Sequence, residues 1–305
     1  MISSLALTFS IFRFVIMRRL FVCVFVIISF QAAGQKDSCT ILYTVEGKEF
    51  AYPRLSSDQH SVLYQSNETG KWQIFVMDLI NKSKYSITSD TFNNNFPDWN
   101  FDNRMIAFVS DRDGNEEVYL FNRDNNTLKR ITQDAGRDIH PYFSPDGKFI
   151  LFNSTRGNNS FDIYKYEIES GITTRITETR EDETCARFSP DMKKIVFLRN
   201  GGNTDDIFIM NVSNNVAINL TKTPYNLDGW PMWNNDGDKI YYSSFINGTY
   251  NIYRINQDGT GRQQLTFPAE GEEDARVYIA RDGKKIIYNK KSGKTISIME
   301  CWLPD

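Results

Sequence analysis

The sequence predicts an all-β fold built from six copies of one four-stranded unit. The first observation is a turn aspartate that recurs in steps of 44, 44, 45, 45 and 46 residues. The second is an Ile-Thr or Leu-Thr pair that recurs with nearly the same step. Two independent landmarks with one period indicate an internal repeat, and four short strands in a repeat of about 40 to 50 residues are typical of a β-propeller. The aspartates are Asp58, Asp102, Asp146, Asp191, Asp236 and Asp282; the threonines are Thr88, Thr132, Thr177, Thr221 and Thr266.

Residues 137–181 illustrate the strands of one unit, here called a, b, c and d in chain order. Strand a is predicted at Pro141–Ser144, and a Pro-Asp-Gly turn leads into strand b at Lys148–Asn153. Strand c at Asp162–Ile168 and strand d at Ile172–Thr177 follow, each after a segment with glycine. No segment has a helical period, so the unit is predicted to be one small antiparallel sheet.

The six units are predicted to form one closed ring in a single domain, residues 35–305. The last unit has strands a, b and c at Val277–Ala280, Lys285–Asn289 and Ile296–Cys301 but lacks strand d. The segment Thr40–Thr44 is in phase with the missing strand, so we expect it to complete the sixth blade. The third position of strand a is always apolar and is predicted to pack between blades: Leu55, Trp99, Phe143, Phe188, Trp233 and Ile279.

Residues 1–34 are predicted to be a cleaved signal peptide. They contain no acidic residue, and a basic pair at Arg18 and Arg19 precedes the apolar run Leu20–Phe30 and small residues that end at Gly34. The uncharged stretch between Arg19 and Gln35 spans 15 residues, and a membrane helix needs about 20. A retained anchor is the alternative. We therefore expect a periplasmic or secreted protein with no stable membrane insertion after cleavage.

Composition and motifs favour a scaffold over a catalyst. The net charge of −3 argues against a nucleic-acid binder, and the only histidines are His60 and His140. The sequence has no Gly-x-Ser-x-Gly nucleophile elbow, no Cys-x-x-Cys pair and no P-loop. No catalytic residue, metal or cofactor is predicted.

Three cysteines follow the predicted signal peptide. Cys39 precedes the expected closing strand, and Cys301 ends strand c of the same blade, which places them opposite one another or one residue off. A disulfide between Cys39 and Cys301 is one reading, and two free thiols are the other. Cys185 is predicted to be a small buried residue rather than a nucleophile.

The top of the central channel is the predicted binding site. Counting back from strand a puts four carboxylates at one opening: Asp138, Glu183, Asp228 and Asp274. Together they would attract a cation or a basic peptide. The alternative is that each caps backbone in its own loop. His140, Trp230 and Arg276 are expected on the same rim, because aromatic and arginine side chains are enriched at protein interfaces.

Two motifs carry a family resemblance. The segments 143–148, Phe-Ser-Pro-Asp-Gly-Lys, and 108–119 resemble the WD-type repeat of TolB-like propellers, over nearly all of the chain after residue 34. Met192 and Gln59 depart from it, because each stands where the turn glycine is expected. As a family, TolB is a periplasmic component of the Tol–Pal envelope system with an α/β domain ahead of its propeller; the resemblance here is to the propeller alone.

The resemblance implies a non-catalytic exported scaffold that binds a protein or peptide of the cell envelope. The same blade also occurs in prolyl-oligopeptidase-type enzymes and in sugar-acting proteins. The alternative function is therefore a carbohydrate-active hydrolase or lyase, with an oligosaccharide ligand and channel-mouth carboxylates such as Asp138 and Asp228 as acid and base. A purely structural propeller is the third hypothesis.

Overall fold

The computed structural model describes residues 39–157, 159–202 and 204–303. The predicted signal peptide, residues 1–34, lies outside the described residues. Within the described ranges the regular structure is entirely β-strand, and none of it is a helix that could cross a membrane.

Twenty-four strands run through this described part of the chain. In chain order they are β1 (Cys39–Thr44), β2 (Phe50–Leu55), β3 (Ser61–Ser66), β4 (Gln73–Asp78), β5 (Lys84–Ser86), β6 (Asn94–Trp99), β7 (Met105–Ser110), β8 (Glu117–Asn122), β9 (Thr127–Arg130), β10 (Asp138–Phe143), β11 (Phe149–Ser154), β12 (Asp162–Glu167), β13 (Thr173–Arg175), β14 (Asp182–Phe188), β15 (Lys194–Asn200), β16 (Asp205–Asn211), β17 (Ala217–Asn219), β18 (Leu227–Trp233), β19 (Lys239–Ile246), β20 (Thr249–Asn256), β21 (Gln263–Gln264), β22 (Glu272–Ile279), β23 (Lys285–Ser292) and β24 (Thr295–Trp302).

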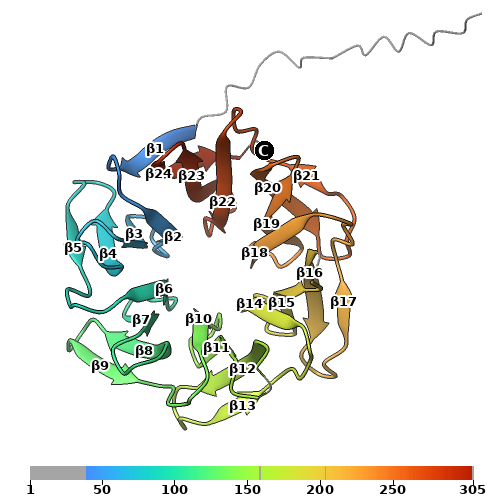
Figure 1. Ribbon diagram of the computed structural model, residues 1–305, viewed down its shortest axis with the longest axis horizontal. Coiled ribbons are helices and arrows are strands. Elements are labelled where there is room, and N and C mark those ends of the chain that lie inside the picture. Colours follow the sequence, from blue (N-terminus) through green and yellow to red (C-terminus); the bar gives the residue numbers. More distant parts are fainter. Residues whose placement is uncertain (1–38, 158, 203, 304–305) are drawn as a thin grey trace, which may run out of the picture. The chain divides into compact units, whose positions relative to one another are not determined.

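The strands form small antiparallel arrays of four. The sheets β2–β5, β6–β9 and β10–β13 follow chain order, whereas the sheet β1-β24-β23-β22 joins the first strand to the last three. The arrays β14–β17 and β18–β21 share one sheet through a single parallel bridge between Asp205 and Leu227. Within the unit 37–305 the arrays follow one another around a centre, with β2, β6, β10, β14, β18 and β22 innermost (Figure 1).

The recurring threonine fixes the edge of each array. In five arrays its hydroxyl oxygen accepts the backbone N–H of the residue 14 positions earlier, near the start of strand c. Thr132, which is 3% exposed, accepts from Val118 and donates its own proton to the buried carboxylate of Glu117. The hydroxyl thus satisfies a buried donor and a buried acceptor at once, which explains why threonine recurs there.

The recurring aspartate fixes the a–b turn. Five of the six aspartates accept the N–H of the residue two positions later, as Asp146 does from Lys148 at 3.1 Å. Asp191 accepts the hydroxyl of Ser189 as well, and these bonds hold the pKa of its carboxyl below the usual value. The turn residue after the aspartate has a left-handed backbone even where it is not glycine, as at Gln59 and Met192.

Apolar side chains pack between neighbouring arrays, as predicted. Trp99 of β6 lies in one cluster with residues of β3, β4, β7 and β8, and its 6% exposure confirms an inter-array position. The equivalent Leu55, Phe188, Trp233 and Ile279 are also buried, while Phe143 is only partly buried. Neither face of a single array is polar enough to remain in water, so each array depends on its neighbours.

The innermost strands begin earlier than predicted. Strand a of the third array was expected to start at Pro141, but β10 starts at Asp138. The pairing with β11 shifts register between Ile139 and Tyr142, and His140 within the bulge has φ 52°. The corresponding shift occurs in every innermost strand. A proline follows the left-handed residue in four of them, which is compatible with a bulge because proline has no N–H for the ladder.

The first and last strands are joined twice. β1 pairs antiparallel with β24, with Tyr43 opposite Ile298. Cys39 and Cys301 are direct partners in this pairing, and a disulfide links them across a Cα–Cα distance of 4.0 Å. Their sequence separation is 262 residues, so the bond constrains almost the whole unit.

We expect Thr132→Val to lower the free energy of unfolding by about 1–3 kcal/mol, because it leaves the Val118 N–H without its acceptor and removes the hydroxyl that donates to Oε2 of the buried Glu117. Urea unfolding monitored by fluorescence measures this change. Thr132→Ser retains the hydroxyl and is the matched control, so equal losses in both variants would contradict the assigned role.

We expect Cys39→Ser to destabilise the protein by about 2–4 kcal/mol, because the denatured chain regains the freedom that the disulfide removes. Reduction of the wild type should give the same loss in urea unfolding. The reductant should leave the variant unaffected, and a variant as stable as the oxidised wild type would refute this expectation.

Candidate functional site

The bulges direct one side chain from each innermost strand into the centre. We call these residues the central plug: Tyr52, Phe96, His140, Cys185, Trp230 and Arg276. All have φ between 52° and 59°. Because each lies at a bulge, its side chain leaves the plane of its own array and meets those of the others.

The central plug residues contact one another across the channel. The Phe96 ring lies 4.3 Å from that of His140 and 5.0 Å from that of Tyr52. The indole N–H of Trp230 donates to the Tyr52 hydroxyl at 3.3 Å, and the Arg276 guanidinium lies 4.8 Å from the Trp230 ring. The plug side chains therefore meet in the middle of the channel.

The next channel-facing residues form a layer rich in charge and aromatic rings. Arg54 is 3% exposed, and its Nε lies 3.4 Å from Asp98 Oδ1. The Arg187 guanidinium lies 3.5 Å from the centre of the Tyr142 ring, and that of Arg54 lies 5.6 Å from the same ring. Burial and the neighbouring charge of Arg187 lower the pKa of Arg54. Two arginines thus share one carboxylate.

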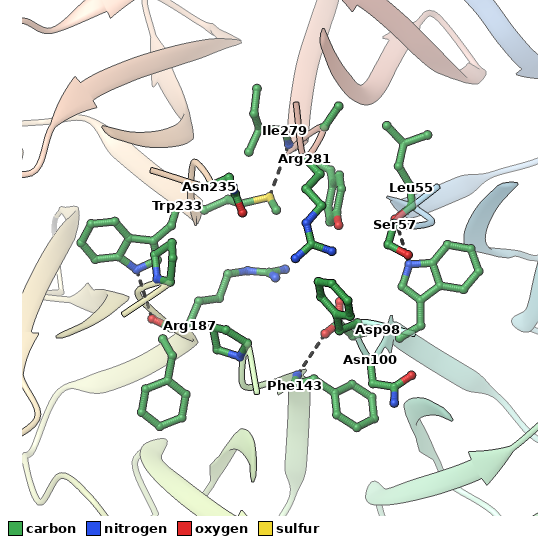
Figure 2. Close-up of a pocket in the computed structure, with 18 of the residues that line it drawn as sticks. Leu55, Ser57, Asp98, Asn100, Phe143, Arg187, Trp233, Asn235, Ile279 and Arg281 are labelled. Atoms are coloured by element: carbon green, nitrogen blue, oxygen red, sulfur yellow. Dashed lines mark hydrogen bonds between the residues drawn. The ribbon is translucent and has the colours of Figure 1, made fainter. Parts of the chain in front are cut away.

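A pocket of about 210 Å³ opens beyond this layer. It lies where the innermost strands run into their a–b turns, an end of the channel that we call the turn end. Residues of all the arrays line it, and Asp98, Arg187, Trp233, Asn235 and Arg281 extend around its centre (Figure 2). We call this cavity the turn-end pocket.

Two indoles form fixed walls of the turn-end pocket. The Trp99 N–H donates to the carbonyl oxygen of Leu55 at 2.9 Å, and the Trp233 N–H donates to that of Arg187 at 3.3 Å. Each bond crosses from one array to its neighbour. The ring positions therefore depend on the arrangement of the arrays, and they give the pocket a preformed shape.

The four predicted carboxylates do not form an acidic opening. Asp138, Glu183, Asp228 and Asp274 lie at the opposite, loop end of the channel and are at most 2% exposed. Their burial argues against the first of the two readings, an acidic opening, because each side chain has partners inside its own array.

Their partners explain the burial. Arg156 binds Asp138 at 2.6 Å and Arg199 binds Glu183 at 2.6 Å. Asp228 accepts the hydroxyls of Ser244 and Thr223. For Asp274 the ammonium of Lys290 lies 3.9 Å away, and burial outweighs that charge and raises the pKa of Asp274 to about 6.

The other predicted site residues lie deeper than expected. His140, Trp230 and Arg276 belong to strands β10, β18 and β22 rather than to loops, and all three are in the central plug. None of the seven predicted binding residues lines the turn-end pocket.

Sequence reasoning missed Arg187 and Arg281. Side chains two positions apart in a regular strand face the same side, but the bulge between Thr184 and Arg187 interrupts this alternation, so the sequence alone contained no clear signal for Arg187. Arg281 lies two residues after the end of β22 and reaches the pocket from there.

No metal site accompanies these groups in the part of the chain that the structure describes. No three His, Cys, Asp or Glu side chains there are close enough to hold an ion. The buried Cys185 thiol lies 3.8 Å from His140 Nδ1, but burial raises the pKa of Cys185, which disfavours a thiolate.

Comparison with known proteins identifies the family. The model of the TolB beta propeller domain matches residues 43–204 and 183–303. The chain belongs to the TolB β-propeller domain family. The predicted resemblance and the all-β, TolB-like propeller fold are thereby confirmed.

Solved structures with the same fold have diverse names. TolB from Acinetobacter baumannii is 27% identical, with a TM-score of 0.65, and the match covers 73% of this chain and 55% of that TolB. An oligogalacturonate lyase from Vibrio parahaemolyticus is 13% identical over 88% of this chain and 96% of its own, with a TM-score of 0.59. The propeller domain of the Trilobed protease from Pyrococcus furiosus is 15% identical over 84% and 82%, with a TM-score of 0.57.

These comparisons leave function open. The chain spans little more than half the length of the Acinetobacter TolB, and the other two likenesses are of fold alone. No curated protein matches the chain.

We expect His140→Gln to gain stability relative to wild type as the pH falls from 6 to 4. Burial and the charges of Arg187, Arg54 and Arg276 lower the pKa of His140 to about 3. Between this value and the ordinary 6.5 the unfolded state binds a proton that the folded state does not, so wild type loses about 1.4 kcal/mol per pH unit that the variant does not lose.

Urea unfolding at each pH measures this difference. His60→Gln is the control, because the His60 side chain is 63% exposed, and it should follow wild type. A constant offset between His140→Gln and wild type across the pH range would disprove the assigned cause.

Proposed function

We propose that this protein is a non-catalytic, exported scaffold that binds a protein or peptide partner of the cell envelope at the turn end of its channel. The observation that carries the proposal is the turn-end pocket, which has a preformed aromatic wall and lining residues from all the arrays. Pockets with apolar walls and a few convergent polar groups are the usual place for ligands in a folded domain.

The proposal includes a ring of six four-stranded blades. Counting β14–β17 and β18–β21 separately, despite their single parallel bridge, supports this number. The pairing of β1 with β24 and the Cys39–Cys301 disulfide support closure by the N-terminal strand. A closed ring would hold the walls of the pocket in place from all sides.

Export supports a periplasmic or secreted location. It rests on the apolar, acid-free character of residues 1–34, and on the Cys39–Cys301 disulfide, since disulfides persist in oxidising compartments. Membership of the TolB propeller family is consistent with an envelope role.

The turn end is favoured over the loop end as the contact surface. At the loop end the carboxylates of Asp138, Glu183, Asp228 and Asp274 are buried and could not reach a partner without local opening. The same burial weighs against the alternative of a carbohydrate-active enzyme with Asp138 and Asp228 as acid and base. A partner-binding role for His140, Trp230 and Arg276 remains a prediction.

Photo-crosslinking tests which end of the channel meets the partner. A benzophenone amino acid replaces Asn235, an exposed residue at the edge of the turn-end pocket, or Tyr225, which is 89% exposed in the connection that leads to β18 at the loop end. We expect irradiation of intact cells to give a covalent partner adduct from position 235 and none from position 225.

The opposite pattern would reject the turn end and restore the loop-end rim. Adducts from neither position would favour the purely structural propeller. Circular dichroism and melting of each labelled variant verify that both remain folded.

A further inference from the structure

Charge at the turn-end pocket is unbalanced. Arg187 and Arg281 line the pocket and Arg54 lies in the layer beneath it, whereas Asp98 is the only carboxylate among the lining residues. Asp98 is already committed, because it lies 3.4 Å from the Arg54 guanidinium and accepts the backbone N–H of Phe143 at 3.0 Å. Positive charge is therefore in excess at the base of a cavity in a protein whose net charge is negative.

Arg187 is held in a conformation that leaves its donors available. Its guanidinium stacks 3.5 Å from the Tyr142 ring centre, so the ring occupies one face of the plane. The N–H groups of a guanidinium point outward in the plane of the group, and two of them can donate parallel hydrogen bonds to the two oxygens of one carboxylate. Arg187 shares the charge of Asp98 with Arg54, but within the described residues no direct hydrogen bond engages its guanidinium, and Figure 2 shows it extending toward the middle of the pocket.

Arg281 places a second guanidinium at the pocket. It follows β22 and stacks 3.6 Å from the centre of the Phe101 ring, which belongs to the β6–β7 turn. Phe101 is 54% exposed, so this pair lies at the solvent side of the cavity. In the described part of the chain Arg281 has no acidic partner, and Figure 2 shows its guanidinium directed to the same space as Arg187.

Arg54 lies beneath the pocket and adds to the local positive field, although it pairs with Asp98. Arg54 is 3% exposed and its Nε makes no hydrogen bond, so the buried charge is only partly compensated. The low pKa of His140 has the same cause in part, since Arg187, Arg54 and Arg276 disfavour a further positive charge in the channel. An anion entering the pocket would relieve this repulsion.

Size and lining limit what the anion can be. The cavity of about 210 Å³ is large enough to admit a side chain or a chain end. Trp99, Phe143, Phe188 and Trp233 would contact an apolar stem, and the arginines would contact its charged end. These dimensions suit one carboxylate on a flexible, partly apolar chain.

We propose that the turn-end pocket binds a carboxylate of an acidic peptide segment, with Arg187 as its main ligand and Arg281 as the second. This inference rests on the proposed function and specifies its partner as a peptide that carries either an acidic side chain or a free C-terminal carboxylate at the contact point.

Three short fluorescent peptides of otherwise identical sequence distinguish these sources. One has an internal Glu and an amidated C-terminus, one has Gln and a free C-terminus, and one has Gln and an amidated C-terminus. Anisotropy titration of the oxidised full-length mature protein up to about 10 mM should show binding of at least one carboxylate peptide and at least about tenfold weaker binding of the third.

Arg187→Gln and Arg281→Gln should each lower the affinity for the carboxylate peptide by about tenfold. Arg281 is exposed, so its variant does not threaten the fold. Arg180→Gln is the matched control, because it removes one exposed positive charge from the connection between β13 and β14, which lies at the loop end and contributes no residue to the pocket lining. It should leave binding unchanged.

Equal affinity for all three peptides, or an Arg281→Gln variant that behaves like Arg180→Gln, would overturn the inference. Arginine-dependent binding of oligogalacturonate without any peptide binding would overturn the peptide as partner and the proposed function with it. A partner adduct at position 235 combined with no carboxylate preference would leave the proposed function standing and reject this inference alone.

Discussion

The fold depends on the burial of the apolar faces of its small sheets, which only the neighbouring sheets shield from water. An array such as β6–β9 buries Trp99 against the array before it and Ala107 and Val109 against the array after it. Each contributes apolar area on both sides, so removal of one array would expose the faces of two others. The recurring polar residues are compatible with this burial, because Thr132 and Glu117 accept hydrogen bonds from the backbone N–H groups of Val118 and Asp134.

The bulge in each innermost strand places one side chain of every array in the channel. A strand without the bulge would alternate its side chains between the two inter-array faces. The left-handed residue instead directs a Tyr, Phe, His, Cys, Trp or Arg toward the centre. Sixteen non-glycine residues of the described chain have positive φ, and the recurrence of six at equivalent positions shows that the strain is a regular part of the architecture. Packing among Tyr52, Phe96 and His140 then keeps the strained backbone in place.

Much of the fold could be predicted because its markers are local. The turn aspartates accept a hydrogen bond from two residues away, and the threonines accept one from 14 residues away, so both impose a fixed spacing on the sequence. The pairing of Tyr43 with Ile298 could be inferred from phase alone. The candidate site could not, because a left-handed residue followed by proline has the sequence pattern of a loop. Because of that pattern, the predicted strand a started after Asp138 and His140, and the binding site was predicted at the loop end of the channel. Arg187 and Arg281 lie at the turn end, and they come together there only because six strands meet in space.

The order in which the cysteines are synthesised has a consequence for biogenesis. Cys39 precedes Cys185 by 146 residues and Cys301 by 262, so in an oxidising compartment the thiol of Cys39 meets that of Cys185 before its native partner exists. Cys185 is 2% exposed once β14 is packed, which withdraws its thiol from such pairing. In the folded protein the burial of Cys185 in the fourth array therefore helps to keep the Cys39–Cys301 pairing specific.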